Sequence, residues 1–123
     1  MILWHWLPNM YYFYIIISVG GRVGFGIAQN IEDRNQQYCS HAGDIVKMYV
    51  YGGQRTHAKA LERTIKTQYV DNIWKISDWQ TEWLNSDITK EQLKAYVDEL
   101  IEQRHFHLTL VKENYDFTQG DLT

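Results

Sequence analysis

Two charged residues, Arg34 and Glu62, lie on helical stripes that are otherwise suited to a protein core. Arg34 falls at helical spacing from Ile31, and Glu62 falls between Leu61 and Ile65 on a second predicted helix. Burying a lone charge is costly, so such residues are normally paired, bound to a ligand or placed in a cleft. The alternatives are therefore that Arg34 and Glu62 pair with each other, or that they serve a binding site.

The two residue types suit phosphate chemistry. Hydrolysis of a phosphodiester needs a hard cation, a fixed positive charge for the developing anion and a group that takes a proton from water. A carboxylate suits Mg²⁺, which prefers oxygen ligands, and an arginine fork matches the geometry of phosphate. A tyrosine is a poor base at its ordinary pKa of about 10, so it needs a neighbouring cation that lowers this pKa.

The composition predicts one globular domain. The chain has 123 residues, of which 45% are hydrophobic and 22% are charged, enough for one core and too few for two domains. Its one cysteine, Cys39, excludes an internal disulfide and a cysteine-rich zinc site. No segment resembles a cleavable signal peptide, so we expect a reducing compartment, the cytoplasm, or the host cytoplasm if the chain is phage-encoded.

The net charge of −3 hides an uneven distribution. Residues 47–75 carry six basic side chains against two acidic ones, whereas residues 76–123 carry four against ten. The middle third is where a phosphate backbone is expected to bind, although a solvated helix face would give the same pattern. The candidates for contact with nucleic acid are Arg22, Lys47, Arg55, Lys59, Arg63 and Lys66.

The first part of the chain predicts a β-hairpin. Residues 1–9 form an N-terminal arm, a buried aromatic and β-branched strand covers about Met10 to Val19, and Gly20-Gly21 is a two-residue turn before a strand at 22–28. Gly24 leaves one face of the second strand bare, so either another group packs very closely there or a ligand approaches it. A membrane anchor at 2–19 is an alternative, although polar residues and a proline interrupt that run.

The middle of the chain predicts helix, strand and helix. Asn30 is a suitable N-cap for a helix that ends near Gly43, and a strand at 45–51 is closed by Gly52-Gly53. Thr56 is the expected N-cap of the next helix. The apolar face of that helix is formed by Ala58, Leu61, Ile65 and Tyr69.

The last part predicts a loop, a helix and a late strand. Residues 71–86 fit neither period and are expected to be a packed loop, while Thr89 and Gln92 form a capping box before a strongly amphipathic helix. Residues 106–110 are a candidate strand, the domain spans 10–111, and 112–123 are expected to be a flexible tail.

Two further groups of residues have alternative roles. His105 and His107 have the spacing of metal ligands on a strand, or are merely exposed. Trp74, Trp79 and Trp83 are expected in the core, with base stacking as the alternative.

The order of these motifs resembles the GIY-YIG nuclease superfamily. The resemblance consists of an aromatic strand, a glycine turn, a strand with Phe25-Gly26-Ile27, the spacing Asn30-x-x-x-Arg34-x-x-x-Tyr38, a third strand and a helix with Glu62. Glu82-Trp83-Leu84 is similar to the "EWF" box of a phage and restriction-related branch. The resemblance covers about residues 10–101. It implies an α/β (α+β) domain whose small three-stranded mixed or antiparallel sheet is flanked by helices.

The resemblance also implies roles for single residues. Glu62 matches the metal-binding glutamate, which would hold Mg²⁺ or Mn²⁺, and Arg34 matches the arginine on the scissile phosphate. Tyr38 matches an assisting residue one helical turn later, and Tyr14, or Tyr12 in a shifted register, matches the tyrosine of the first strand. His41, further along the helix of Arg34, completes the catalytic candidates.

The sequence departs from the family pattern at two points. Gly24 stands where the family has a tyrosine or lysine, and the first strand lacks its glycine. The resemblance implies a metal-dependent DNA endonuclease, and the departures leave open a weakened domain that binds nucleic acid or a protein partner. A homodimer and, as a third alternative, a small membrane-associated protein are also open.

Overall fold

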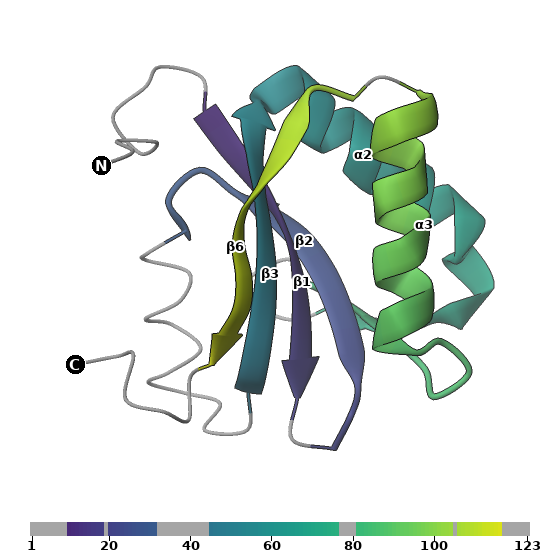
Figure 1. Cartoon of the computed structure of the whole chain (residues 1–123). Coiled ribbons are helices and arrows are strands. Elements are labelled where there is room, and N and C mark those ends of the chain that lie inside the picture. Colours follow the sequence, from purple (N-terminus) through teal and green to yellow (C-terminus); the bar gives the residue numbers. More distant parts are fainter. Residues whose placement is uncertain (1–9, 19, 32–44, 77–80, 105, 117–123) are drawn as a thin grey trace.

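The fold is described by a computed structural model for residues 10–18, 20–31, 45–76, 81–104 and 106–116; within these ranges the side chains of 45–47 and 112–116 are not described. Figure 1 shows the elements, which follow one another as β1 (Met10–Ser18), β2 (Val23–Ala28), β3 (Ile45–Gln54), α2 (Arg55–Gln68), the 3₁₀ helix η2 (Val70–Asn72), β4 (Ile73–Ile76), β5 (Glu82–Leu84), α3 (Lys90–Gln103) and β6 (Leu108–Asp116).

The strands form one antiparallel sheet in the order β4-β5-β2-β1-β3-β6. The predicted mixed α/β domain is confirmed, but the predicted sheet of three strands is too small. Residues 71–86, expected as a packed loop, contain β4 and β5. These strands have four and three residues, which is too short for an alternating pattern to stand out, and only their pairing with each other and with β2 defines them.

The sheet is built around β1, which is buried on both faces. Phe13, Ile15 and Ile17 belong to one core cluster, and Tyr12, Tyr14 and Ile16 belong to a second cluster on the opposite face. Strands buried on both faces are apolar along their whole length, as the sequence of β1 is. The N-terminal hydrophobic run therefore includes the central strand of the sheet. None of the described helices is long and apolar enough to span a membrane.

The turn between β1 and β2 is one residue longer than predicted. Ser18 and Arg22 face each other, with the Ser18 amide donating to the Arg22 carbonyl at 3.0 Å, so the loop is not confined to Gly20-Gly21. The Gly21 amide donates to the Ser18 carbonyl, and Gly21 itself has a φ of 80°. This is the arrangement in which a left-handed residue, usually glycine, follows a turn and returns the chain to the sheet.

Two glycines that were expected to end β3 lie inside it. β3 continues to Gln54, and both glycines pair with β1 and with β6. A Cβ on Gly52 would crowd the ring of Tyr12, and one on Gly53 would overlap the backbone of His107. These glycines therefore allow neighbouring groups to approach the strand closely, which a local turn prediction does not anticipate.

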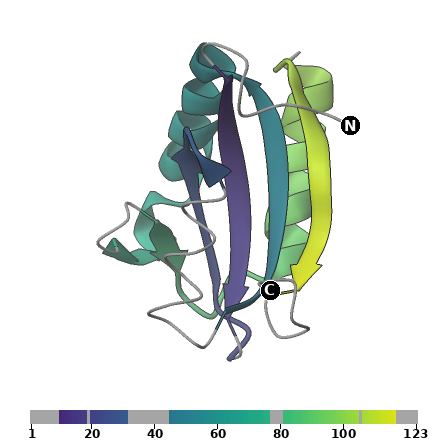
Figure 2. The ribbon, with the colours of Figure 1, turned by 90° about the vertical axis from the view of Figure 1, so that its left-hand side faces the viewer.

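Both described helices cover the same face of the sheet (Figure 2). α2 packs on it with Ala58, Leu61 and Ile65, as the apolar stripe predicts. α2 begins at Arg55, just before the expected cap Thr56. α3 buries a second set, Leu93, Val97 and Leu100, and its capping prediction is confirmed, because the Thr89 hydroxyl accepts a hydrogen bond from the Gln92 amide at 3.1 Å.

The late strand is longer than predicted. β6 extends from Leu108 to Asp116 along β3, so the sheet continues beyond the expected domain end at 111 into the segment expected to be a tail. Because this strand lies at the sheet edge and contains many polar residues, it lacks the alternating hydrophobic pattern from which a strand is predicted. The arm at 1–9 and the helix expected between Asn30 and Gly43 lie, apart from the first two residues of the latter, outside the described residues.

Candidate functional site

Glu62 is held at the border of the buried face of α2. Its side chain is 16% exposed, and it lies next to Leu61 and one turn before Lys66 on the same helix. The Lys66 ammonium nitrogen is 4.0 Å from Glu62 Oε1 and 2.9 Å from Glu82 Oε1. One lysine therefore stands between two carboxylates that come from distant parts of the chain.

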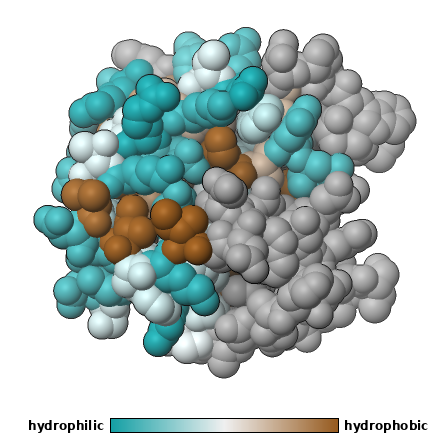
Figure 3. All heavy atoms as spheres, turned by 180° about the vertical axis from the view of Figure 1, so that it is seen from behind, coloured by the Kyte–Doolittle hydropathy of each residue, from teal (hydrophilic) through white to brown (hydrophobic). Residues whose placement is uncertain are grey.

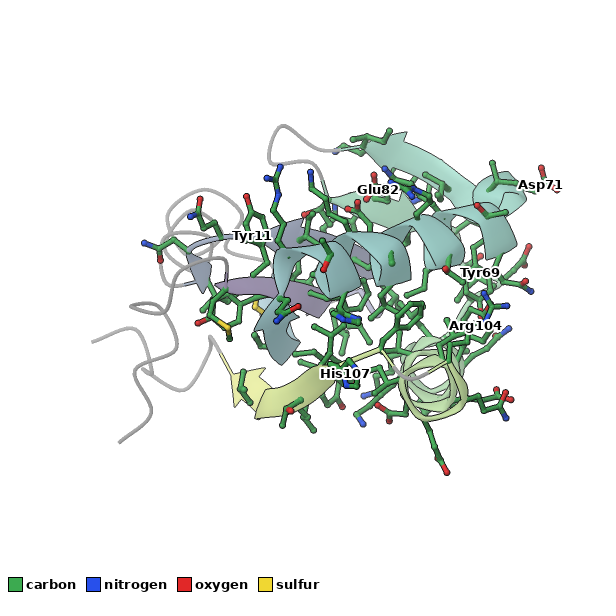
Figure 4. All side chains as sticks on the ribbon, turned by 90° about the horizontal axis from the view of Figure 1, so that it is seen from above. Tyr11, Tyr69, Asp71, Glu82, Arg104 and His107 are labelled. Carbon is green, nitrogen blue, oxygen red and sulfur yellow. The ribbon has the colours of Figure 1, made fainter. Side chains whose placement is uncertain are left out.

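Glu82 is more deeply buried than Glu62. It opens β5, where it pairs with Phe25 of β2 and Ile76 of β4, and this register turns its side chain to the face that α2 covers. Figure 4 views the labelled Glu82 beside α2. The residue is 3% exposed, and its Oε2 atom is buried without a hydrogen-bond partner in the described structure. The sequence prediction used Glu82 only as part of a motif, because nothing local marks it as the neighbour of Glu62.

The three charges influence one another's protonation. Burial raises the pKa of Glu62, and the nearby Glu82 raises it further, against the opposing effect of Lys66, Lys59 and Arg63. The hydrogen bond to Glu82 raises the pKa of Lys66. The lysine is thus held in its charged form, while burial and Glu82 oppose ionisation of Glu62.

The carboxylates of Glu62 and Glu82 fit a hard cation chemically. Both face one positive group, and Mg²⁺ is commonly held by one or two carboxylates with waters completing its shell. The Oε2 atom of Glu82, buried without a partner, is a further oxygen that a cation would satisfy. Across the described part of the chain, no group of three or more His, Cys, Asp or Glu side chains is placed to hold a metal ion. A cation would also require Lys66 to move aside.

A row of basic residues runs along α2 beside this cluster. Arg55, Lys59 and Arg63 follow one another at every fourth position, and Lys66 continues the row; we call these four residues the basic stripe. Arg55 also packs over the ring of Tyr11, with its guanidinium carbon 5.4 Å from the ring centroid. Within the described residues, no ion pair involves the first three members of the stripe.

A groove lies between α2 and the edge of the sheet. It has a volume of about 580 Å³, and its polar lining comes from Arg63, Lys66, Thr67 and Glu82, its apolar lining from Val70, Ile73 and Ile76. Figure 3 shows hydrophobic residues gathered next to hydrophilic ones on this side of the molecule. Val70 and Ile76 are among the most exposed large apolar residues of the described chain. The lining of the groove therefore combines basic side chains, exposed apolar side chains and the buried carboxylate of Glu82.

Tyr14 is not part of this site. It is fully buried in the cluster on the face of β1 opposite to α2, and its hydroxyl lies 2.6 Å from the hydroxyl oxygen of Thr81. Tyr12, its alternative in a shifted register, lies in the same cluster. The structure thus places Glu62 and both candidate tyrosines on opposite faces of the sheet, because residues two apart on a strand share one face.

The side chains of Trp83 of β5 and of Thr81, just before that strand, fill the bare face at Gly24. A Cβ on Gly24 would lie 2.9 Å from Thr81 Cγ2 and 2.9 Å from Trp83 Cε3. Gly24 pairs with Trp83, so the indole lies over the backbone where a side chain would otherwise project. Of the two explanations predicted for this glycine, close packing is the one observed.

Of the other residues that the sequence suggested for catalysis, metal binding or nucleic-acid binding, only some belong to the described part of the chain. Arg34, Tyr38, Cys39 and His41 lie outside the described residues, as do Trp79, His105 and the side chain of Lys47. His107 meets His57 of α2: its amide donates to His57 Nδ1 at 3.3 Å and the ring centroids are 4.9 Å apart. Arg22 packs over Trp74 at 4.8 Å from the ring centroid, so it stands apart from the stripe.

Comparison with known proteins identifies no relative. No protein-family model, no curated protein and no solved structure matches this chain.

Proposed function

We propose that this domain binds nucleic acid through the basic stripe of α2 and does so without hydrolysing it, as a weakened relative of a GIY-YIG-like fold. The observation that carries the proposal is the position of Arg55, Lys59 and Arg63 on one side of α2. They are turned away from the buried Ala58 and Leu61, which anchor the helix to the sheet. The helix thus presents a row of cations on its outer side.

The local charge favours a phosphate backbone as partner. Guanidinium groups match phosphate oxygens bidentately, and cations that neutralise phosphates release condensed counterions, which drives binding. Lys66 extends the row but is partly engaged by Glu82 at 2.9 Å. The overall net charge of −3 does not oppose such binding, because the acidic residues are concentrated after position 76.

The packing at β1 and β2 supports binding without hydrolysis. Tyr14, which the resemblance assigns to the reaction, is sealed from solvent and engaged with Thr81. Gly24, where the family keeps a reactive side chain, is covered by Trp83. Neither Tyr14 nor the position of Gly24 is on the side of the sheet that carries Glu62, so the groups that the family uses from these two strands do not reach that carboxylate.

The proposal is tested by fluorescence anisotropy with labelled DNA at low salt. The variant Lys59→Glu/Arg63→Glu is expected to bind at least about 10-fold more weakly than the wild-type protein, because two phosphate contacts become repulsions. The matched control, Lys90→Glu/Arg104→Glu, makes the same change in net charge on α3. It is expected to retain most of the affinity. Equal losses in both variants would show that only net charge matters.

Metal-dependent hydrolysis of DNA is the second candidate. It is favoured by the position of two carboxylates, Glu62 and Glu82, around the same lysine. In that case the two carboxylates would hold Mg²⁺ or Mn²⁺, which would polarise a phosphate and supply an activated water. Incubation of supercoiled plasmid with the protein, with and without Mg²⁺, separates the candidates. Binding alone predicts no nicking above background. Nicking that requires Mg²⁺ and disappears in Glu62→Ala, Glu82→Gln and Arg34→Ala would establish the nuclease.

A further inference from the structure

Trp74 is a large aromatic residue that the fold leaves exposed. It lies on β4, the edge strand of the sheet, and is 50% exposed. Its indole Nε1 donates a hydrogen bond to the Leu84 carbonyl oxygen of β5 at 3.2 Å. The bond holds the ring in one orientation, so the exposed indole is a preformed surface.

Two cations lie over this ring. The guanidinium carbon of Arg22 lies 4.8 Å from the ring centroid, and the Lys75 ammonium lies 5.9 Å from it. Arg22 comes from the end of the β1–β2 hairpin, so the arrangement joins two distant segments. A flat ring that stacks on the indole beneath Arg22 would displace the guanidinium, which would stay within reach of a phosphate attached to that ring.

A second hollow opens beside Trp74. It has a volume of about 250 Å³ and is lined by Arg22, Trp74, Leu84, Asn85 and Ser86. The lining thus combines the aromatic ring and a cation with an amide and a hydroxyl. Small-molecule sites commonly have this composition, an apolar surface with a few polar groups that fix orientation.

We propose that Trp74 is a stacking platform for an unpaired nucleobase and that the domain therefore prefers single-stranded nucleic acid to duplex. This inference rests on the proposed function. A base stacked on Trp74 would leave its phosphate near Arg22 and Lys75. In a duplex both faces of each base are already stacked, so the platform is of use only with a single strand.

The platform and the basic stripe can contact the same strand of nucleic acid. Ile73 and Ile76, which flank Trp74 and Lys75 on β4, line the groove together with Arg63 and Lys66 of the stripe. Trp74 and Lys75 lie between these two isoleucines on β4, which is an edge strand of the sheet. A nucleic-acid backbone that follows the basic stripe would reach Trp74 by crossing β4. Contacts with the stripe would then supply the affinity, and the stacked base would supply the preference for a single strand.

The inference is tested with two probes of about 15 nucleotides, a labelled oligothymidylate and a duplex of equal length. Trp74→Leu keeps an apolar side chain but removes the aromatic face. It is expected to weaken oligothymidylate binding by about 5- to 100-fold and to change duplex binding by less than about twofold. Trp74→Phe, which retains a ring, is expected to stay close to wild type. Val70→Ala, which shortens an exposed apolar residue of the neighbouring groove, is expected to lose much less affinity than Trp74→Leu.

Intrinsic fluorescence gives a second readout on the same proteins. Oligothymidylate is expected to quench the emission of the wild-type protein, and this quenching is expected to decrease in Trp74→Phe, even though that variant still binds. Undiminished quenching would contradict stacking on Trp74.

The failure of this inference differs from the failure of the proposed function. Suppose that Lys59→Glu/Arg63→Glu loses affinity for both probes. If Trp74→Leu then loses affinity equally for both probes, or for neither, the platform is wrong and the basic stripe remains the binding surface. If Val70→Ala loses as much affinity for oligothymidylate as Trp74→Leu does, the surface acts as an apolar patch suited to a protein partner, and the platform is again wrong. If the wild-type protein binds neither probe, the proposed function itself is wrong.

Discussion

At the scale of single residues, the site is a balance of three charges. Lys66 lies between Glu62 and Glu82 and offsets the repulsion between them, but at 2.9 Å it is committed mainly to Glu82. Glu62 is left with burial and a like charge against the weaker attraction of its basic neighbours. The site therefore keeps a carboxylate whose ionisation opposes folding.

The pH dependence of stability follows from this. The pKa of Glu62 is raised above its ordinary value of 4.5, so the folded chain holds that proton more tightly than the unfolded chain does. The contribution of Glu62 to stability is therefore most favourable below pH 4.5 and decreases as the pH rises through its folded pKa. We expect Glu62→Gln to raise the melting temperature at about pH 7, and the gain to vanish at about pH 3.

A matched variant controls for the lost charge. The side chain of Glu91 on α3 is 73% exposed, so Glu91→Gln is expected to have little effect at either pH. A lower melting temperature for Glu62→Gln at about pH 7 would instead show that the attraction between Glu62 and Lys66 outweighs the cost of burying Glu62.

A methyl group at Gly24 tests the packing that closes the bare strand face. It would meet Thr81 and Trp83 at 2.9 Å, so Gly24→Ala is expected to lower the free energy of unfolding by about 1–3 kcal/mol. In Gly20→Ala the nearest described atom to the new methyl, Ser18 Oγ, is 4.0 Å away, and that variant serves as control. Urea denaturation measures both. Equal stability of the two variants would mean that Trp83 can move aside at no cost.

At the scale of elements, helices and strands differ in how far they are locally determined. α3 has its own cap, and its buried residues follow the helical period, so its first turn can be tested alone. Thr89→Ala removes the acceptor of the Gln92 amide and is expected to destabilise the protein by about 1 kcal/mol. Thr89→Ser keeps the acceptor and should be nearly neutral. A loss in Thr89→Ser as large as that in Thr89→Ala would assign the effect to the methyl group instead.

Strands β4 and β5 are defined by their partners. Glu82 and Trp83 pair with β2 on one side and β4 on the other, and the short segments have no pattern that would predict this. Their pairing nevertheless creates the site, because it brings Glu82 to Lys66, covers Gly24 with Trp83 and fixes Trp74 at the edge. The part of the chain that local patterns describe least is thus the part that completes the candidate site.

At the scale of the whole molecule, the charge asymmetry sets how binding responds to salt. If three stripe residues each neutralise one phosphate of duplex DNA, the logarithm of the binding constant falls with the logarithm of salt concentration with a slope of about −3. Neutralising two of them in Lys59→Gln/Arg63→Gln is expected to reduce the slope to about −1. Anisotropy titrations at several salt concentrations measure both slopes. A slope near zero for the wild-type protein would mean that its binding is not driven by phosphate contacts.

The sequence by itself determined the elements whose patterns are local. The apolar run of β1, the stripe of Ala58, Leu61 and Ile65 on α2 and the cap of α3 follow from side-chain period and capping chemistry, and the structure confirms them. The order of residues also places Glu62 within this stripe, between Leu61 and Ile65, whereas the structure places it at the border of the buried face with its side chain 16% exposed.

Tertiary structure alone decided which residues share a site. Glu82 is distant in sequence from Glu62, and only the β2–β5 pairing turns it toward α2. The same pairing places Thr81 against Tyr14 on the opposite face of the sheet. Because successive residues of a strand point to opposite faces, the side on which each side chain lies depends on register, and register is set by pairing between distant segments.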